Sequence, residues 1–254
     1  MVFIIIHPVL MRAKEDTMLD IIAAIFVAAL YTTLVGTLVG LSPLSAAAKL
    51  ALFAAAAAWL GFVVAIAALG WLAPGAFGPM PGTLLPFATI LALLFGGWSL
   101  VPEFRSAVLA VPLPALVGVH AGRLGGVVFL LFHADGRLSA PFAPVAGIGD
   151  ILTAAFAIAL ASALALSLGV PRILLATWNA FGALDLVVAV SLGLLSMPGT
   201  PFRIFTEEPG TLVMSTVPGV LVPGMVVPIF LFVHFAIAAK LRTAAAKPGR
   251  LAVA

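Results

Sequence analysis

The chain has 254 residues, of which 64% are hydrophobic and 8% are charged, whereas soluble domains contain about 25% charged residues. This composition is typical of an integral membrane protein. The net charge of +3 does not indicate nucleic-acid binding, because the basic residues stand singly at the ends of apolar runs or in the C-terminal tail. The absence of cysteine excludes disulfides, thiolate metal sites and cysteine nucleophiles.

Long apolar runs follow one another along the chain. A spanning helix needs about 20 apolar residues, and clusters of Pro, Gly and charged residues divide the chain into seven candidates. They cover residues 18–40, 46–72, 83–101, 115–133, 149–169, 173–197 and 218–239. The sequence therefore predicts an all-α integral membrane protein, a bundle of about seven transmembrane helices in one polytopic domain over residues 1–254.

Basic residues at the ends of these runs predict the orientation. One side holds seven of them, namely Lys49, Arg105, Arg172, Lys240, Arg242, Lys247 and Arg250. The other side holds four, namely Arg12, Lys14, Arg137 and Arg203. Because cytoplasmic loops carry the excess of Lys and Arg, we expect an external N-terminus and a cytoplasmic basic tail (243–254) in a prokaryotic inner membrane.

The connections on the two sides differ in composition. Those expected outside (72–86, 135–150 and 196–219) are rich in Pro and Gly and long enough to cover a vestibule. The inner connection, 101–114, is expected to form a short surface helix that its prolines end.

A histidine and an arginine interrupt the fourth apolar run. Gly118, Gly122 and Gly126 recur there every four residues, a spacing that lets membrane helices pack closely. His120 and Arg123, three residues apart, are neighbours on the helix surface. Arg123 lies roughly 10 Å inside the run at 1.5 Å per residue, so it either extends to the headgroups or points inward to a partner.

The run 173–197 supplies that partner. Asp185 lies near its middle, Trp178 shares the Asp185 stripe of the helix, and Asn179 is about 100° away. An unpaired guanidinium in hydrocarbon costs at least ~2.5–3.5 kcal/mol, so we expect an Arg123–Asp185 pair inside the bundle. This pair serves either as a binding or relay site or as a structural staple.

Two further polar positions lie in the last runs. His234 is near the inner end of 218–239 at the depth of His120, so the two rings face each other if their helices touch. Asp150 opens 149–169, where a carboxylate favours the helix N-terminus, and we interpret it as a cap. The candidate binding or relay residues are thus His120, Arg123, Trp178, Asn179, Asp185 and His234.

Several activities are excluded by missing residues. The last run has no lysine before Lys240, which excludes a retinal Schiff base in its middle. The sequence contains no HExxH, no GxSxG and no P-loop glycine pattern. We therefore expect neither an enzyme nor a metal site.

Three functions remain open. The first is a transporter or channel for a small solute or protons that uses the intramembrane Arg, Asp and His residues. The second is an accessory or assembly subunit of a membrane complex. The third is a b-type haem protein with a haem between His120 and His234, His133 and His7 being the other histidines; otherwise no cofactor is expected. The expected partners are the lipid bilayer and other membrane subunits or further copies of the chain.

A transport site and a staple differ in their access to water. A transport site predicts a cavity between 115–133, 173–197 and 218–239, whereas a staple needs none. The residues expected to line this cavity are His120, Arg123, Trp178, Asn179 and Asp185.

Overall fold

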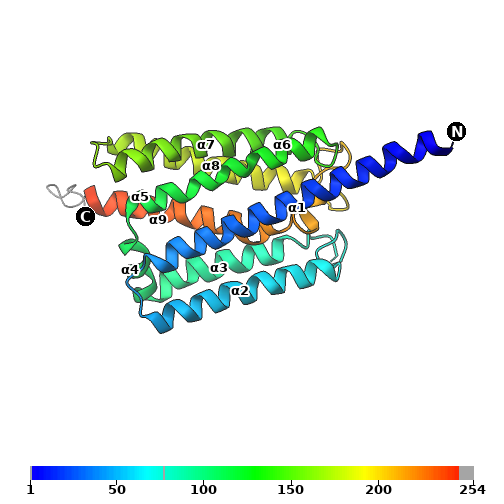
Figure 1. The fold of residues 1–254 in the computed structure, drawn as a ribbon. Helices are drawn as coiled ribbons and strands as arrows, with labels where there is room; N and C mark the ends of the chain where they lie inside the picture. The colour runs from blue at the N-terminus through cyan, green and yellow to red at the C-terminus, as the bar shows by residue number, and fades with distance from the viewer. Residues whose placement is uncertain (1, 77, 246–254) are drawn as a thin grey trace.

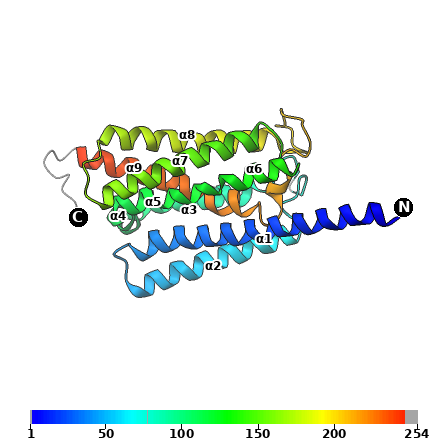
Figure 2. The same ribbon diagram turned by 45° about the horizontal axis from the view of Figure 1, so that its top comes forward.

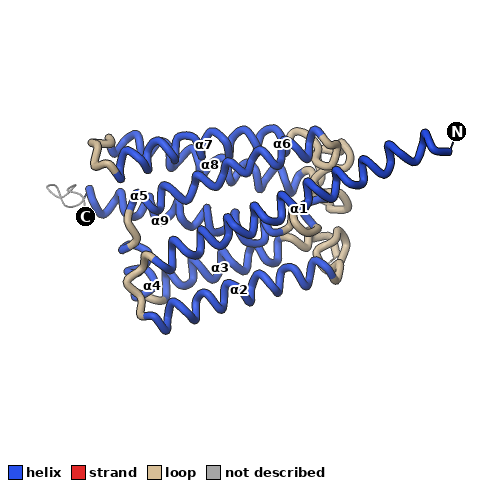
Figure 3. Tube along the Cα trace, viewed as in Figure 1, coloured by secondary structure: helices blue, strands red, loops and turns tan. Residues whose placement is uncertain are grey.

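The computed structural model describes residues 2–76 and 78–245, with side chains for 18–76 and 78–243. In this part of the chain every regular element is a helix (Figure 3). The elements are α1 (Val2–Gly40), α2 (Ala46–Ala68), α3 (Leu84–Leu100), α4 (Pro102–Ala110), α5 (Leu113–Gly118), the 3₁₀ helix η1 (Val119–Gly125), α6 (Gly126–Ala134), α7 (Phe142–Ala165), α8 (Arg172–Leu195), the 3₁₀ turn η2 (Leu212–Ser215), the π-helical turn η3 (Val222–Val226) and α9 (Val227–Ala245).

Six helical segments of the described chain are long and apolar enough to cross a bilayer. They are Met18–Gly40, Ala46–Ala68, Leu113–Ala134, Phe142–Ala165, Arg172–Leu195 and Val222–Thr243. The predicted run 83–101 forms α3, which has 17 residues and a length of about 25 Å. It qualifies only together with α4, from which it is bent by 101°.

The helices run side by side, and their connections collect at two ends (Figure 1). The connections 69–83, 135–141 and 196–221 lie at the end nearest the N-terminus, here called the loop end. The helix α4 and the C-terminal end of α9 lie at the opposite end, here called the tail end. Figure 2 shows α1 and α2 side by side along one edge of the bundle. The basic tail predicted at 243–254 lies largely outside the described residues, since 246–254 are not described.

Helix α7 begins earlier than the sequence predicts. Pro141 and Pro144 made 135–150 resemble a loop, but a proline is tolerated in the first turn of a helix, where the amide hydrogens have no helical acceptor. The helix begins at Phe142. Asp150 therefore lies more than two turns inside α7, and its interpretation as a helix cap is wrong.

The segment 113–134 is a single span whose winding changes midway. Between α5 and α6, η1 has the tighter 3₁₀ turn of about three residues. Gly122 and Gly125 therefore share a face, and both lie against side chains of α1. Gly126 faces α7, where an added Cβ would lie 2.5 Å from the carbonyl oxygen of Gly147. The glycines thus serve two interfaces rather than the single stripe that the sequence suggested.

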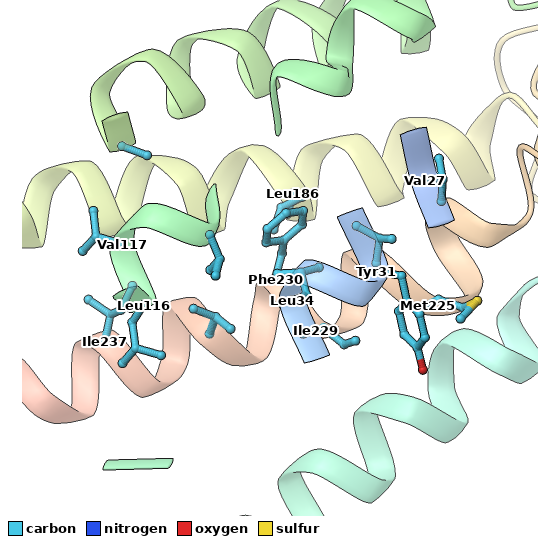
Figure 4. Packing of buried hydrophobic residues seen from close by; sticks show 14 of the residues in the cluster. Val27, Tyr31, Leu34, Leu116, Val117, Leu186, Met225, Ile229, Phe230 and Ile237 are labelled. Carbon is cyan, nitrogen blue, oxygen red and sulfur yellow. The ribbon is translucent and has the colours of Figure 1, made fainter. Parts of the chain in front are cut away.

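Apolar side chains close the tail end of the bundle. Leu116 and Val117 of α5 belong to one core cluster with Ile237 of α9, Leu116 lies beside Ile237 (Figure 4), and all three are fully buried. Leu175, in the first turns of α8, belongs to the same core and is 3% exposed. We call these four residues the tail-end plug, because each lies about one helical turn closer to the tail end than the polar residues described below.

The close approach of α6 to α7 is testable by adding one methyl group. We expect Gly126→Ala to lower the stability of the purified protein by about 1–3 kcal/mol, because the Cβ would overlap the α7 backbone. Gly61→Ala in α2 is the matched control, since its Cβ would meet nothing within 4 Å, and it should stabilise by about 0.4–1 kcal/mol. Equal melting temperatures for the two variants would contradict the close packing.

Candidate functional site

The guanidinium of Arg123 joins three helices. Its Nε donates a hydrogen bond to Oδ1 of Asp150 on α7 over 2.6 Å, and its Nη2 donates to Oδ2 of Asp185 on α8. Its Nη1 donates to the carbonyl oxygen of Gly182 over 2.9 Å. Arg123 is 2% exposed. The side chain therefore points into the bundle and does not extend to the surface.

Two glycines make room for the carboxylates. A Cβ on Gly149 would overlap the Asp185 carboxylate, so only glycine at this position lets α8 present Asp185 so close to α7. A Cβ on Gly126 would lie 2.7 Å from the Cβ of Asp150. The small residues thus pack the helices and at the same time place both acids around one arginine.

His234 continues the hydrogen-bond network towards the tail end. Its Nε2 lies 3.3 Å from Nη1 of Arg123. Since arginine has no acceptor, Nε2 accepts this bond and the ring proton is on Nδ1. Nδ1 then donates to Oδ1 of Asn179 over 2.9 Å, and the Asn179 amide donates to the His234 carbonyl oxygen over 3.1 Å. These partners hold His234 as a neutral ring of fixed tautomer.

His120 stacks on this network and has no exposed surface. Its ring centroid is 4.0 Å from that of His234 and 5.0 Å from that of Phe230, and Trp178 meets it edge-on at 5.4 Å. Neither ring nitrogen of His120 has a hydrogen-bond partner, and the hydroxyl of Thr153 also has none. Buried polar atoms of this kind usually bind ordered water.

The charges around Arg123 do not cancel. One guanidinium faces two carboxylates, and the neighbouring His234 is neutral in its hydrogen-bonding role. With both carboxylates ionised the group carries one net negative charge, which is unfavourable where water is scarce. A proton or a small cation would neutralise it.

Two cavities approach this group from the loop end. One has a volume of about 50 Å³ between α1, α6 and the start of α9, and its charged lining residues are Arg123 and Asp150. The other has a volume of about 80 Å³ between α3, α7, α8 and η3, and its polar lining residues are Asp150, Thr83 and Thr211. Both are otherwise apolar, and they share Asp150. This carboxylate is thus where the cavities meet the polar cluster.

The six candidate residues from the sequence lie together in this cluster, but two expectations differ. Of the five residues expected to line a cavity, only Arg123 lines one of these two, which also reach Asp150. The other four lie behind them, namely His120, Trp178, Asn179 and Asp185. Asp150 is the member that the sequence interpretation missed. The available signal was its position directly after Gly147 and Gly149 in an apolar run, since small residues suit the close packing of membrane helices.

His133 lies outside the cluster. His133, at the loop end of α6, bonds through Nδ1 to the carbonyl oxygen of Leu138 at 2.7 Å. The side chain of His7 lies outside the described residues. The rings of His120 and His234 are stacked with an interplanar angle of 30°, and both nitrogens of His234 are engaged. A haem between these two histidines does not fit this arrangement.

Residues 80–242 match a protein family described as a domain of unknown function, DUF8737. The chain belongs to this family, because the match covers more than half of its length. No curated protein and no solved structure shows significant similarity to the chain. The matched residues include the whole Arg123 cluster and begin after α1 and α2.

The Arg123–Asp185 pair is testable by a double-mutant cycle. We expect Arg123→Leu to lower the free energy of unfolding by about 3–5 kcal/mol, because it leaves buried carboxylates without a cation. Asp185→Asn should cost less, since Arg123 keeps Asp150 as a partner. The double variant should lose about 1–3 kcal/mol less than the sum of the single variants.

The matched control is the pair of Arg137 and Asp20, whose side chains are 24% and 37% exposed. The same cycle there should give a coupling of about 0.2–1 kcal/mol, because solvent screens the charges. A coupling at Arg123 no larger than this would show that the buried pair does not hold the helices together.

Proposed function

We propose that this chain is a polytopic inner-membrane transporter or channel for a small solute or protons, with Arg123, Asp150, Asp185 and His234 at its central site. The apolar helices support insertion, and in this proposal the seventh span would be α3 taken together with α4, the pair bent by 101°. The basic residues favour a cytoplasmic tail end. The loop end would then face outward.

One observation carries this proposal. A single buried guanidinium is shared by two carboxylates, and one of these, Asp150, borders cavities that extend towards the loop end. Ionisable residues inside a membrane protein are costly and commonly mark ion or substrate pathways. If the cluster only held the helices together, one carboxylate would be enough to neutralise its one arginine, and the second carboxylate would not be needed.

The arrangement suggests the order of events. A proton or cation arriving through the cavities meets Asp150 first and neutralises the excess charge, which weakens the hold of Asp150 on Arg123. Arg123 keeps its bonds to Asp185 and Gly182. The next polar groups towards the tail end are His234, Asn179 and His120, so passage requires the tail-end plug to separate.

Two irregular helical segments flank the site and suit such a movement. The 3₁₀ helix η1 carries His120 and Arg123, and the π-helical turn η3 lines both cavities through Val222. Such turns inside longer helices often mark hinges or functional sites. We propose that they change winding when the plug opens.

The accessory-subunit alternative is supported by the depth of the cluster. Arg123, His120 and His234 are nearly inaccessible, which also suits a network that only fixes helix packing. The two functions differ in whether water reaches Asp150 and whether charge crosses the membrane.

Cysteine labelling tests the access, since the chain has no cysteine of its own. We expect Met214→Cys, which lines both cavities, to react with a membrane-impermeant maleimide added from the outside. Leu116→Cys in the tail-end plug should stay unreactive, and the loop position Thr200→Cys should react as a positive control. Protection of Met214→Cys under conditions that label Thr200→Cys would favour the accessory subunit.

Proton flux tests the transport itself. In vesicles with an imposed membrane potential, we expect the wild type to acidify an enclosed pH indicator faster than protein-free vesicles. Asp150→Asn should reduce the rate to the protein-free level, because it removes the group that first takes up the proton. Asp135→Asn is the control, since Asp135 lies at the loop end beside Arg137 at 3.8 Å. Equal rates for the wild type and Asp150→Asn would contradict a role of this carboxylate in proton movement.

A further inference from the structure

A third cavity lies apart from the polar cluster, between the α1/α2 pair and α3, α4 and α9. It has a volume of about 620 Å³ and a lining that is almost wholly apolar, with only Tyr31, Ser42 and Trp59 carrying polar side-chain atoms. We call it the lateral groove. Leu52 and Phe62 of α2 and Leu93 of α3 line it and are 37%, 45% and 63% exposed, so its walls are not covered by protein.

The lateral groove is closed towards the loop end. The indole Nε1 of Trp59 donates to the carbonyl oxygen of Gly224 over 3.3 Å, which ties α2 to η3. Val63, one turn further along α2, is fully buried and packs beside the same glycine. A ligand in the groove therefore has to enter from the side or from the tail end.

Its length matches one leaflet of a bilayer. On α2 the lining runs from Leu52 to Phe62, which corresponds to about 15 Å at 1.5 Å per residue. The hydrocarbon core of a bilayer is about 30 Å thick. A helix of another protein would need the full thickness, but Trp59 and Gly224 close the groove at about half of it. Acyl chains of a single leaflet suit this length.

Positive charge gathers at the tail-end mouth. Lys49 begins α2, with its ammonium bound to the carbonyl oxygen of Gly40 at 2.8 Å, and Arg105 is exposed on α4 without an ion pair in the described chain. The ammonium of Lys240 binds the carbonyl oxygens of Leu109 and Val111 just beyond α4. Glu103 is the one acidic residue of α4 and offsets part of this charge. The net charge at the tail-end mouth is therefore positive, which favours the binding of an anion.

We propose that the lateral groove binds the acyl chains of an anionic phospholipid from the tail-end leaflet, with Lys49 and Arg105 holding its phosphate. This proposal rests on membrane insertion but not on transport. The lipid would fill the space between α1 and α2 and the part of the chain that matches the family, which begins at residue 80. It would thereby fix the position of the α1/α2 pair against α3.

The test compares lipid retention in the purified full chain. After reconstitution with equal amounts of phosphatidylglycerol and phosphatidylcholine and extraction in mild detergent, native mass spectrometry should show phosphatidylglycerol bound preferentially. Lys49→Ala with Arg105→Ala should lower this preference by roughly 10- to 30-fold, as expected for two cations near a membrane surface. Arg172→Ala is the matched control, a tail-end cation at the start of α8 outside the groove, and should leave the preference unchanged.

A second variant separates the groove from the surface charge. Ala55 lines the groove and is exposed within it, so Ala55→Phe should displace both lipids while leaving the melting temperature within the range of the Arg172→Ala control. Unchanged retention in both Ala55→Phe and the Lys49/Arg105 variant would overturn the proposal. A dimer without bound lipid that Ala55→Phe dissociates would also overturn it, since a second copy would then occupy the groove.

Discussion

The described bundle depends on one buried cation. Arg123 is 2% exposed, so its guanidinium must be satisfied inside the protein by Asp150, Asp185 and the carbonyl oxygen of Gly182. Leaving such a charge unpaired in hydrocarbon costs several kcal/mol. The requirement fixes the positions of η1, α7 and α8 relative to one another, and it explains why glycines stand where these helices approach.

The same requirement gives the bundle two unlike halves. On the loop-end side of Arg123 the space between helices remains partly open and is lined by Asp150. On the tail-end side, His234 and Asn179 complete the hydrogen bonds, and Leu116 and Ile237 fill the space beyond them. In the proposed transporter, this polar centre with one open and one closed approach would correspond to a single state of alternating access.

The composition and spacing of the chain determined much of this arrangement in advance. The apolar runs predicted the helices that the structure contains, because 20 consecutive apolar residues have few alternatives. The pairing of Arg123 with Asp185 was predicted from the cost of an unpaired charge in hydrocarbon. An arginine at that depth needs a carboxylate partner, and Asp185 lies at a similar depth. The equal depths of His120 and His234 predicted their meeting only on the condition that their helices touch, and the stacked rings show that they do.

Only the tertiary structure showed that Asp150 is the second carboxylate beside Arg123, and which faces of the helices lie against one another. Asp150 was read as a cap because prolines near 141–144 concealed the start of α7, and a proline in a first turn gives the same local signal as one in a loop. The prediction of a single glycine stripe over 118–126 assumed 3.6 residues per turn. Because η1 has about three residues per turn, Gly122 lies towards α1 instead. Depth and polarity are properties of single residues and can be read along the chain. The rotation and winding of a helix depend on all its neighbours at once, so the cavities at Asp150 and the lateral groove emerge only when the helices are packed.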